Sequence, residues 1–126
     1  MNITVSGVIF TVGSAGGTDK WIAALYNSAG TLLGNSDTAG ITMGSSALKQ
    51  KFSFTGGTGS GPVAVPGPAA YFIGLQSNGT TANFRGFINA TEGFITGSAT
   101  GSFGTVLSIT PGTIYTVHVG PFASTY

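Results

Sequence analysis

Residues 48–55 read LKQKFSFT, and this stretch decides the fold class because polar and apolar side chains alternate along it. Successive side chains of an extended strand point to opposite faces, so a period of two predicts one face on a core and the other in solvent. The outer face is Lys49, Lys51 and Ser53, and the inner face is Gln50, Phe52 and Phe54. Two lysines on one strand face are typical of a solvated or edge-protecting surface.

A second stretch, KWIAALYN at residues 20–27, is apolar on both faces. One face carries Trp21, Ala23 and Leu25, and the other carries Ile22, Ala24 and Tyr26. A strand that is apolar on both sides is covered on both sides. We therefore expect a central strand, or a strand whose outer face meets a partner.

The rest of the chain repeats this pattern. Short β-branched or aromatic runs alternate with clusters of Gly, Ser, Asn and Pro, and no window keeps a helical period with caps. Further strands are expected at residues 2–12 with a change of phase at Gly7, and at 31–33, 40–43, 69–76, 82–89, 105–109 and 113–119. The fold class expected is all-β: a single antiparallel β-sandwich of about eight strands, jelly-roll-like or of another Greek-key topology. A closed barrel is the second choice.

Two connections have clear signals. Residues 56–68 are rich in Gly and Pro, which predicts a flexible loop or arm within one domain spanning residues 1–126. Asn78-Gly79 lies between two apolar runs, and this dipeptide favours a tight β-hairpin because both residues tolerate positive φ.

The chain is poor in groups that carry chemistry. Its 126 residues include four basic and three acidic side chains, one histidine and no cysteine, against 22 glycines. Ordinary domains are about a quarter charged. We expect a structural or binding protein rather than an enzyme, with no cofactor. The net charge of +1 gives no footprint for nucleic acid.

Each candidate reactive group has a simpler structural interpretation. His118 has no second histidine to share a metal with, so a structural role is favoured. Asp19, Asp37 and Glu92 do not form a dense acidic loop, and we interpret them as solvated turn residues. The glycines of residues 57–61 are not followed by the Lys-Ser/Thr of a phosphate loop.

Aromatic side chains offer a second kind of site. A platform for stacking sugars could draw on Trp21, Tyr26, Tyr71, Tyr115 and Tyr126. Most of them lie inside strand patterns, which favours a core or interface position, and Tyr126 is the one expected to be free.

Composition also bears on location and association. Absence of cysteine is compatible with a reducing cytoplasm, and we see neither a signal-peptide pattern nor an apolar run of membrane-spanning length. A mean hydropathy of +0.36 with almost no net charge has two explanations. Either apolar surface is covered by copies of the chain or a partner, or a large core raises the value.

Three stretches in combination resemble small β-sandwich virion proteins of tailed bacteriophages and prophages. They are residues 23–36 (AALYNSAGTLLGNS), residues 68–85 (PAAYFIGLQSNGTTANFR), and the ending from Thr100 through Pro121. The resemblance covers most of the chain after residue 20. Its motifs are structural and carry no catalytic residues.

The resemblance implies a capsid decoration, or cement, protein made in the host bacterial cytoplasm and located on the virion surface. Its partners would be the major capsid protein and itself, with a trimer favoured. The alternative is a tail-fibre or baseplate module that binds host glycans. For core or self-association we select Trp21, Leu25, Tyr26, Phe52, Phe54, Tyr71, Ile73 and Leu75. For capsid contact we select Met1, Ile3, Val5, Pro62 and Pro66.

Overall fold

The computed structural model describes residues 2–14, 17–44, 48–55, 61–84, 86–88, 94–95, 101–111, 114–115, 119–121 and 123–125. Over these residues every regular element is a strand, and no helix occurs that is long and apolar enough to cross a membrane. The strands are β1 (Asn2–Val5), β2 (Gly7–Ser14), β3 (Lys20–Asn27), β4 (Leu32–Asn35), β5 (Ile41–Thr42), β6 (Lys49–Ser53), β7 (Val63–Pro66), β8 (Tyr71–Ser77), β9 (Asn83–Phe84), β10 (Gly86–Ile88), β11 (Phe94–Ile95), β12 (Ile114–Tyr115), β13 (Val119–Pro121) and β14 (Ala123–Thr125).

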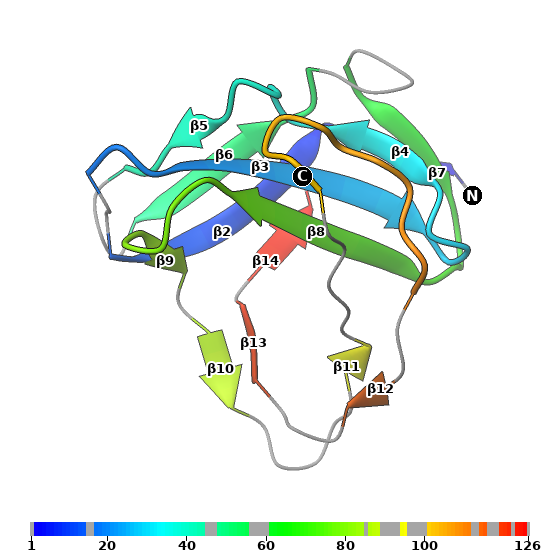
Figure 1. Cartoon of the computed structure of the whole chain (residues 1–126). Coiled ribbons are helices and arrows are strands. Elements are labelled where there is room, and N and C mark those ends of the chain that lie inside the picture. The colour runs from blue at the N-terminus through cyan, green and yellow to red at the C-terminus, as the bar shows by residue number, and fades with distance from the viewer. Residues whose placement is uncertain are drawn as a thin grey trace.

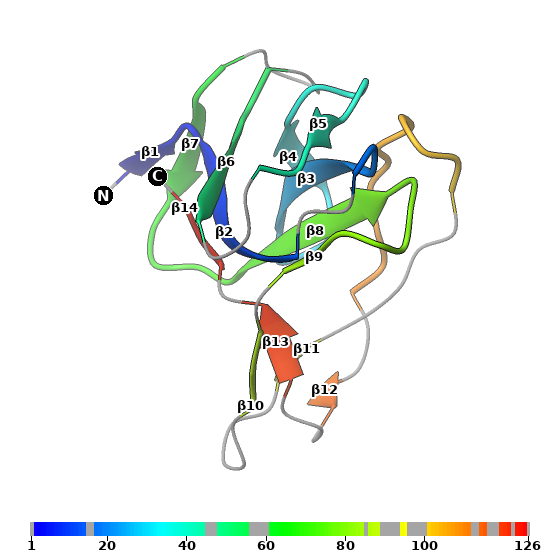
Figure 2. The same cartoon turned by 90° about the vertical axis from the view of Figure 1, so that its left-hand side faces the viewer.

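Two sheets face each other in a sandwich-like arrangement (Figures 1 and 2). In one sheet β2 lies between β14 and β6, and β9 also pairs with β2. In the other, β3 lies between β8 on one side and β4 and β5 on the other. Every pairing among the described strands is antiparallel, which confirms the expected all-β antiparallel class.

The core lies between the two sheets and is built on the predicted alternation. Phe52 and Phe54 of the 48–55 stretch are buried, whereas Lys49 and Lys51 are exposed. Phe10 of β2 meets the ring of Phe52 edge to face, with centroids 5.8 Å apart. Aromatic pairs of this geometry stabilise a fold by about 1 kcal/mol beyond the burial of their area. The inward side of β3 contributes Ala23 and Leu25 to the same core.

The second apolar face of β3 is covered by the chain itself. Ile22, Ala24 and Tyr26 are buried, and the segment of residues 101–111 runs across the outside of the β4–β3–β8 sheet (orange in Figure 1). We call this segment the strap. It has no strand or helix, so the strand expected at residues 105–109 is wrong. Its backbone makes hydrogen bonds to turns and side chains instead of to a strand. For example, Gly30 O accepts from Ile109 N at 2.8 Å.

The N-terminal segment and part of the Gly/Pro-rich stretch form a ribbon. β1 pairs with β7 from Asn2↔Pro66 to Val5↔Val63. The flexible arm predicted for residues 56–68 is therefore wrong at Val63–Pro66, where Val65 is buried and anchors the ribbon to the core. Residues 56–60 lie outside the described part of the chain.

The predicted hairpin at Asn78-Gly79 is also wrong. β8 pairs with β3, whereas β9 pairs with β2, so the connection between them crosses from one sheet to the other. Gly79 does not take the positive φ that the tight turn needs. The connection is held by Asp19, whose carboxylate accepts from Thr81 N at 2.7 Å and Ala82 N at 2.9 Å.

Candidate functional site

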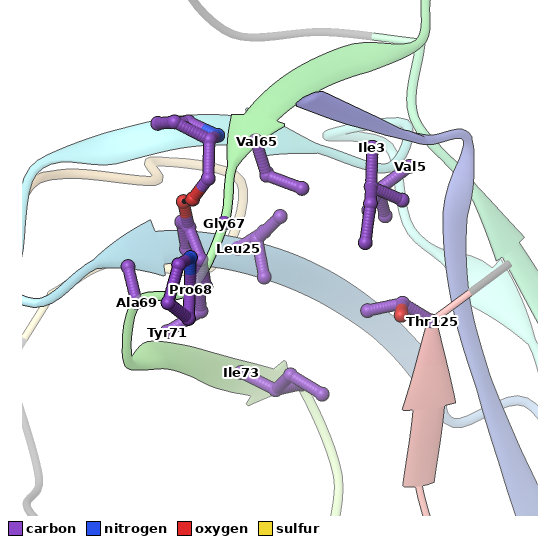
Figure 3. A pocket seen from close by; sticks show the side chains of 11 residues that line it. Ile3, Val5, Leu25, Val65, Gly67, Pro68, Ala69, Tyr71, Ile73 and Thr125 are labelled. Atoms are coloured by element: carbon purple, nitrogen blue, oxygen red, sulfur yellow. Dashed lines mark hydrogen bonds between the residues drawn. The ribbon is translucent and has the colours of Figure 1, made fainter. Parts of the chain in front are cut away.

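An apolar pocket of about 420 Å³ opens beside the β1–β7 ribbon. Figure 3 shows that its side chains come from five strands (β1, β3, β7, β8 and β14) and from the link between β7 and β8. The lining residues are Ile3, Val5, Leu25, Val65, Pro66, Gly67, Pro68, Ala69, Tyr71, Ile73 and Thr125. Segments far apart in the sequence therefore meet at this corner of the sandwich.

The pocket has a buried floor and an open rim. Val5, Leu25 and Val65 are 5%, 1% and 7% exposed and belong to the core cluster. Ile3 and Ile73 are 49% and 37% exposed, and both face the pocket from opposite sides (Figure 3). The core thus reaches the surface here, and an apolar group of a partner that entered would displace water from Ile3 and Ile73.

The rim is tied together by one strong hydrogen bond. The Tyr71 hydroxyl donates to the carbonyl oxygen of Pro66 at 2.6 Å. This bond links the end of β7 to the start of β8 across the intervening residues 67–70. It also satisfies the tyrosine hydroxyl, so the pocket wall presents the apolar ring.

Among the described residues no charged side chain lines the pocket, and the polar side chains in the lining are those of Tyr71 and Thr125. What the pocket can do is bury apolar surface, at about 25 cal/mol for each Å² removed from water. The arrangement is suited to binding an apolar group.

The structure brings together residues that the sequence analysis had selected for two different purposes. Leu25, Tyr71 and Ile73 were selected for core or self-association. Ile3, Val5 and Pro66 were selected for capsid contact, yet all six line this one pocket. Val5 is buried as part of the floor, so it does not belong to the exposed rim.

The remaining selected residues lie elsewhere. Phe52 and Phe54 are in the core, and Trp21 and Leu75 pack against it from the second sheet. Tyr26 is buried on the opposite face of β3, and burial raises its pKa above the ordinary value. Pro62 is exposed outside the pocket, and Met1 lies outside the described residues.

Sequence reasoning missed the wall formed by Val65, residues 67–69 and Thr125. The one signal available was the alternation of Val63, Ala64 and Val65, which is a short strand pattern inside a Gly- and Pro-rich stretch. The contribution of Thr125 depends on β14 pairing with β2. No local pattern encodes that long-range contact.

The two carboxylates in the described residues are engaged with backbone. Asp19 holds the β8–β9 connection, and Asp37 Oδ1 accepts from Ala39 N at 2.9 Å, which makes an Asx turn. No group of three or more His, Cys, Asp or Glu that could hold a metal occurs within the described part of the chain. Glu92 and His118 lie outside it.

The described members of the aromatic set considered for a stacking platform lie apart from one another. Trp21 packs edge to face on Phe84 at 4.7 Å, Tyr26 is buried, and the Tyr71 hydroxyl is bonded to the backbone. The side chains of Tyr115 and Tyr126 are outside the described part. The described aromatic residues therefore give no support to the glycan-binding alternative.

Comparison with known proteins gives no relative: no family model, curated protein or solved structure matches the chain.

Proposed function

We propose that this chain is a non-catalytic structural protein of a bacteriophage particle, which decorates the outer surface of the capsid and stabilises it by bridging capsid subunits. The observation that carries the proposal is the apolar pocket between the β1–β7 ribbon and β8, which exposes Ile3 and Ile73 at a rim where the described residues include no charged side chain. The likeness of residues 23–36 and 68–85 to virion proteins supplies the setting.

Shape and apolar contact are the means of attachment in this proposal. A partner that inserts an apolar side chain between Ile3 and Ile73 gains burial without having to desolvate a charge. Such binding depends little on ionic strength, because salt screens charges and not apolar contacts. Each bound copy stabilises the assembled shell through linkage, since it binds the shell and not the separated subunits.

The direct test is the copy number of the chain in purified virions, measured by quantitative mass spectrometry against the major capsid protein. We expect a ratio near one copy per capsid subunit, or one copy for every few subunits. A handful of copies per particle would point to a tail or vertex component. Absence from virions would refute the virion assignment.

A second test addresses the pocket. Particles that lack the chain are incubated with purified wild-type protein or with Ile3→Asp, which places a carboxylate at the rim. The matched control is Leu107→Asp, because Leu107 is 63% exposed on the strap, outside the pocket. We expect Ile3→Asp to lose binding to the particles and Leu107→Asp to keep it. Equal binding by the two variants would exclude the pocket as the attachment site.

A further inference from the structure

One long strand of the molecule has an open edge. β8 pairs with β3 over its whole length, from Asn27↔Tyr71 to Trp21↔Ser77, without a register shift. Among the described strands none pairs with the other side of β8 (Figure 1). That side is therefore a row of backbone donors and acceptors.

The direction of these groups follows from the ladder. Asn78 N donates to Lys20 O at 3.2 Å, and in an antiparallel ladder the hydrogen-bonded pairs recur at every second residue. Phe72, Gly74 and Gln76 therefore direct their backbone groups to β3. The N–H and C=O groups of Tyr71, Ile73, Leu75 and Ser77 are directed away from it, to the edge that no described strand pairs with.

This edge lacks the features by which proteins prevent unwanted pairing. Native edge strands are blunted by charged side chains, prolines or bulges. On the opposite sheet the edge strand β6 has exposed Lys49 and Lys51, and the ribbon strand β7 ends in Pro66. β8 reads YFIGLQS, with no charge, no proline and no bulge over seven residues.

We propose that two copies of this chain associate through their β8 edges, side by side and antiparallel about a two-fold axis, so that the β4–β3–β8 sheet continues from one molecule into the next. A second copy supplies the same alternating donors and acceptors, so a two-fold pairing matches each outward N–H with a C=O. The chain's net charge of +1 opposes this contact little.

A register centred on Ile73 uses three of these four residues and places the most exposed side chain of β8 at the axis. Ile73 then faces its own counterpart, and Tyr71 faces Leu75 of the second copy. Ile73 is 37% exposed in the single chain, so pairing removes apolar surface from water at the axis. A two-fold axis perpendicular to the sheet keeps both pockets on the same face, and both are lined by Tyr71 and Ile73.

This dimer is independent of the proposed function and differs from the trimer that the resemblance implied. Sedimentation equilibrium of the purified chain over a wide range of concentrations tests it. We expect a monomer–dimer equilibrium for the wild type and loss of the dimer in Ile73→Lys, which puts like charges opposite each other at the axis. The matched control is Leu48→Lys, because Leu48 is 60% exposed next to β6, and it keeps the dimer.

A second variant keeps the test decisive if Ile73→Lys does not fold. Ile73→Pro removes an N–H that is directed away from β3, so the ladder inside the molecule stays intact. We expect a monomer with the circular dichroism spectrum of the wild type. A wild type that stays monomeric at every concentration, a trimer, or a dimer that survives both substitutions in folded protein would overturn the proposal.

Because the natural chain has no cysteine, a single introduced thiol reports the contact directly. Ile73→Cys treated with a short bis-maleimide is expected to give a covalent dimer, and Leu48→Cys is expected to stay monomeric. Cross-linking of both variants to the same extent would show collision rather than a defined interface and would also overturn the proposal.

Discussion

Replacement of Gln76 by alanine should release the strap from the sheet. The Gln76 side chain bonds to the strap at three points: Nε2 donates to Ser102 O at 3.0 Å and to Thr105 O at 3.4 Å, and Oε1 accepts from Gly104 N at 3.0 Å. A neutral hydrogen bond contributes about 1 kcal/mol net, and the longest of the three contributes least. The two short bonds together stabilise the attached strap by about 2 kcal/mol.

Amide hydrogen exchange measures this local opening. The informative amides are those of Thr105 and Ile109, which donate to the backbone oxygens of Ser102 and Gly30 and not to the Gln76 side chain. A loss of about 2 kcal/mol raises their exchange rates about 30-fold. Gln50→Ala is the matched control, because Gln50 Oε1 accepts from Gly44 N at 3.0 Å on another part of the surface. Unchanged exchange at Thr105 and Ile109 in Gln76→Ala would refute the role of this side chain.

Three further predictions concern stability. Gly30→Ala should lower the free energy of unfolding, measured in urea, by clearly more than Gly17→Ala. Both glycines have positive φ, and a residue with a Cβ destabilises that conformation by about 1–2 kcal/mol, but only at Gly30 would the Cβ also collide with Ile109 O. Burial raises the pKa of Tyr26, so the neutral side chain favours the folded state, and the free energy of unfolding should fall as the pH rises above about 10. The free energy of unfolding of Tyr26→Phe should fall less over the same pH range, and identical pH profiles would contradict this. Trp21→Ala should lower the free energy of unfolding, measured by thermal melting, by a few kcal/mol. Trp21→Phe should lower it much less, because the buried Nε1 has no partner within the described part of the chain. Equal losses of stability in the two variants would contradict the core packing of the ring.

The parts of the fold that were predicted correctly are those in which a local pattern is sufficient. The alternation at residues 48–55 places Phe52 and Phe54 in the core and Lys49 and Lys51 on the surface, because strand geometry alone assigns the faces. The change of phase at Gly7 was located correctly, but residues 2–12 are not one strand: β1 pairs with β7, and β2 begins at Gly7 and pairs with β6. Both faces of β3 are buried, as its composition required.

The errors share one cause, which is that the partner of a segment is distant in sequence. The Asn78-Gly79 signal was outweighed by Asp19, whose carboxylate holds the connection from 62 and 63 residues away. Residues 105–109 have the composition of a strand, yet their hydrogen bonds go to a turn and to Gln76. The pocket was missed as a unit because its lining comes from five strands whose pairings no local period specifies.

The two explanations of the high hydropathy can now be separated by region. The outer face of β3 was the main candidate for a partner surface, but the strap of the same chain covers it. Exposed apolar surface in the described residues is instead concentrated at Ile3 and Ile73, on the rim of the pocket, with Leu48 and Leu107 standing apart from it.

Attachment through the pocket and pairing through β8 would then act together. A dimer that presents two pockets on one face binds a repetitive surface at two points, and the second contact forms at the high effective concentration set by the first. Ile3→Asp is expected to lose attachment to particles and to keep the dimer, because Ile3 lies on the rim of the pocket and not on β8.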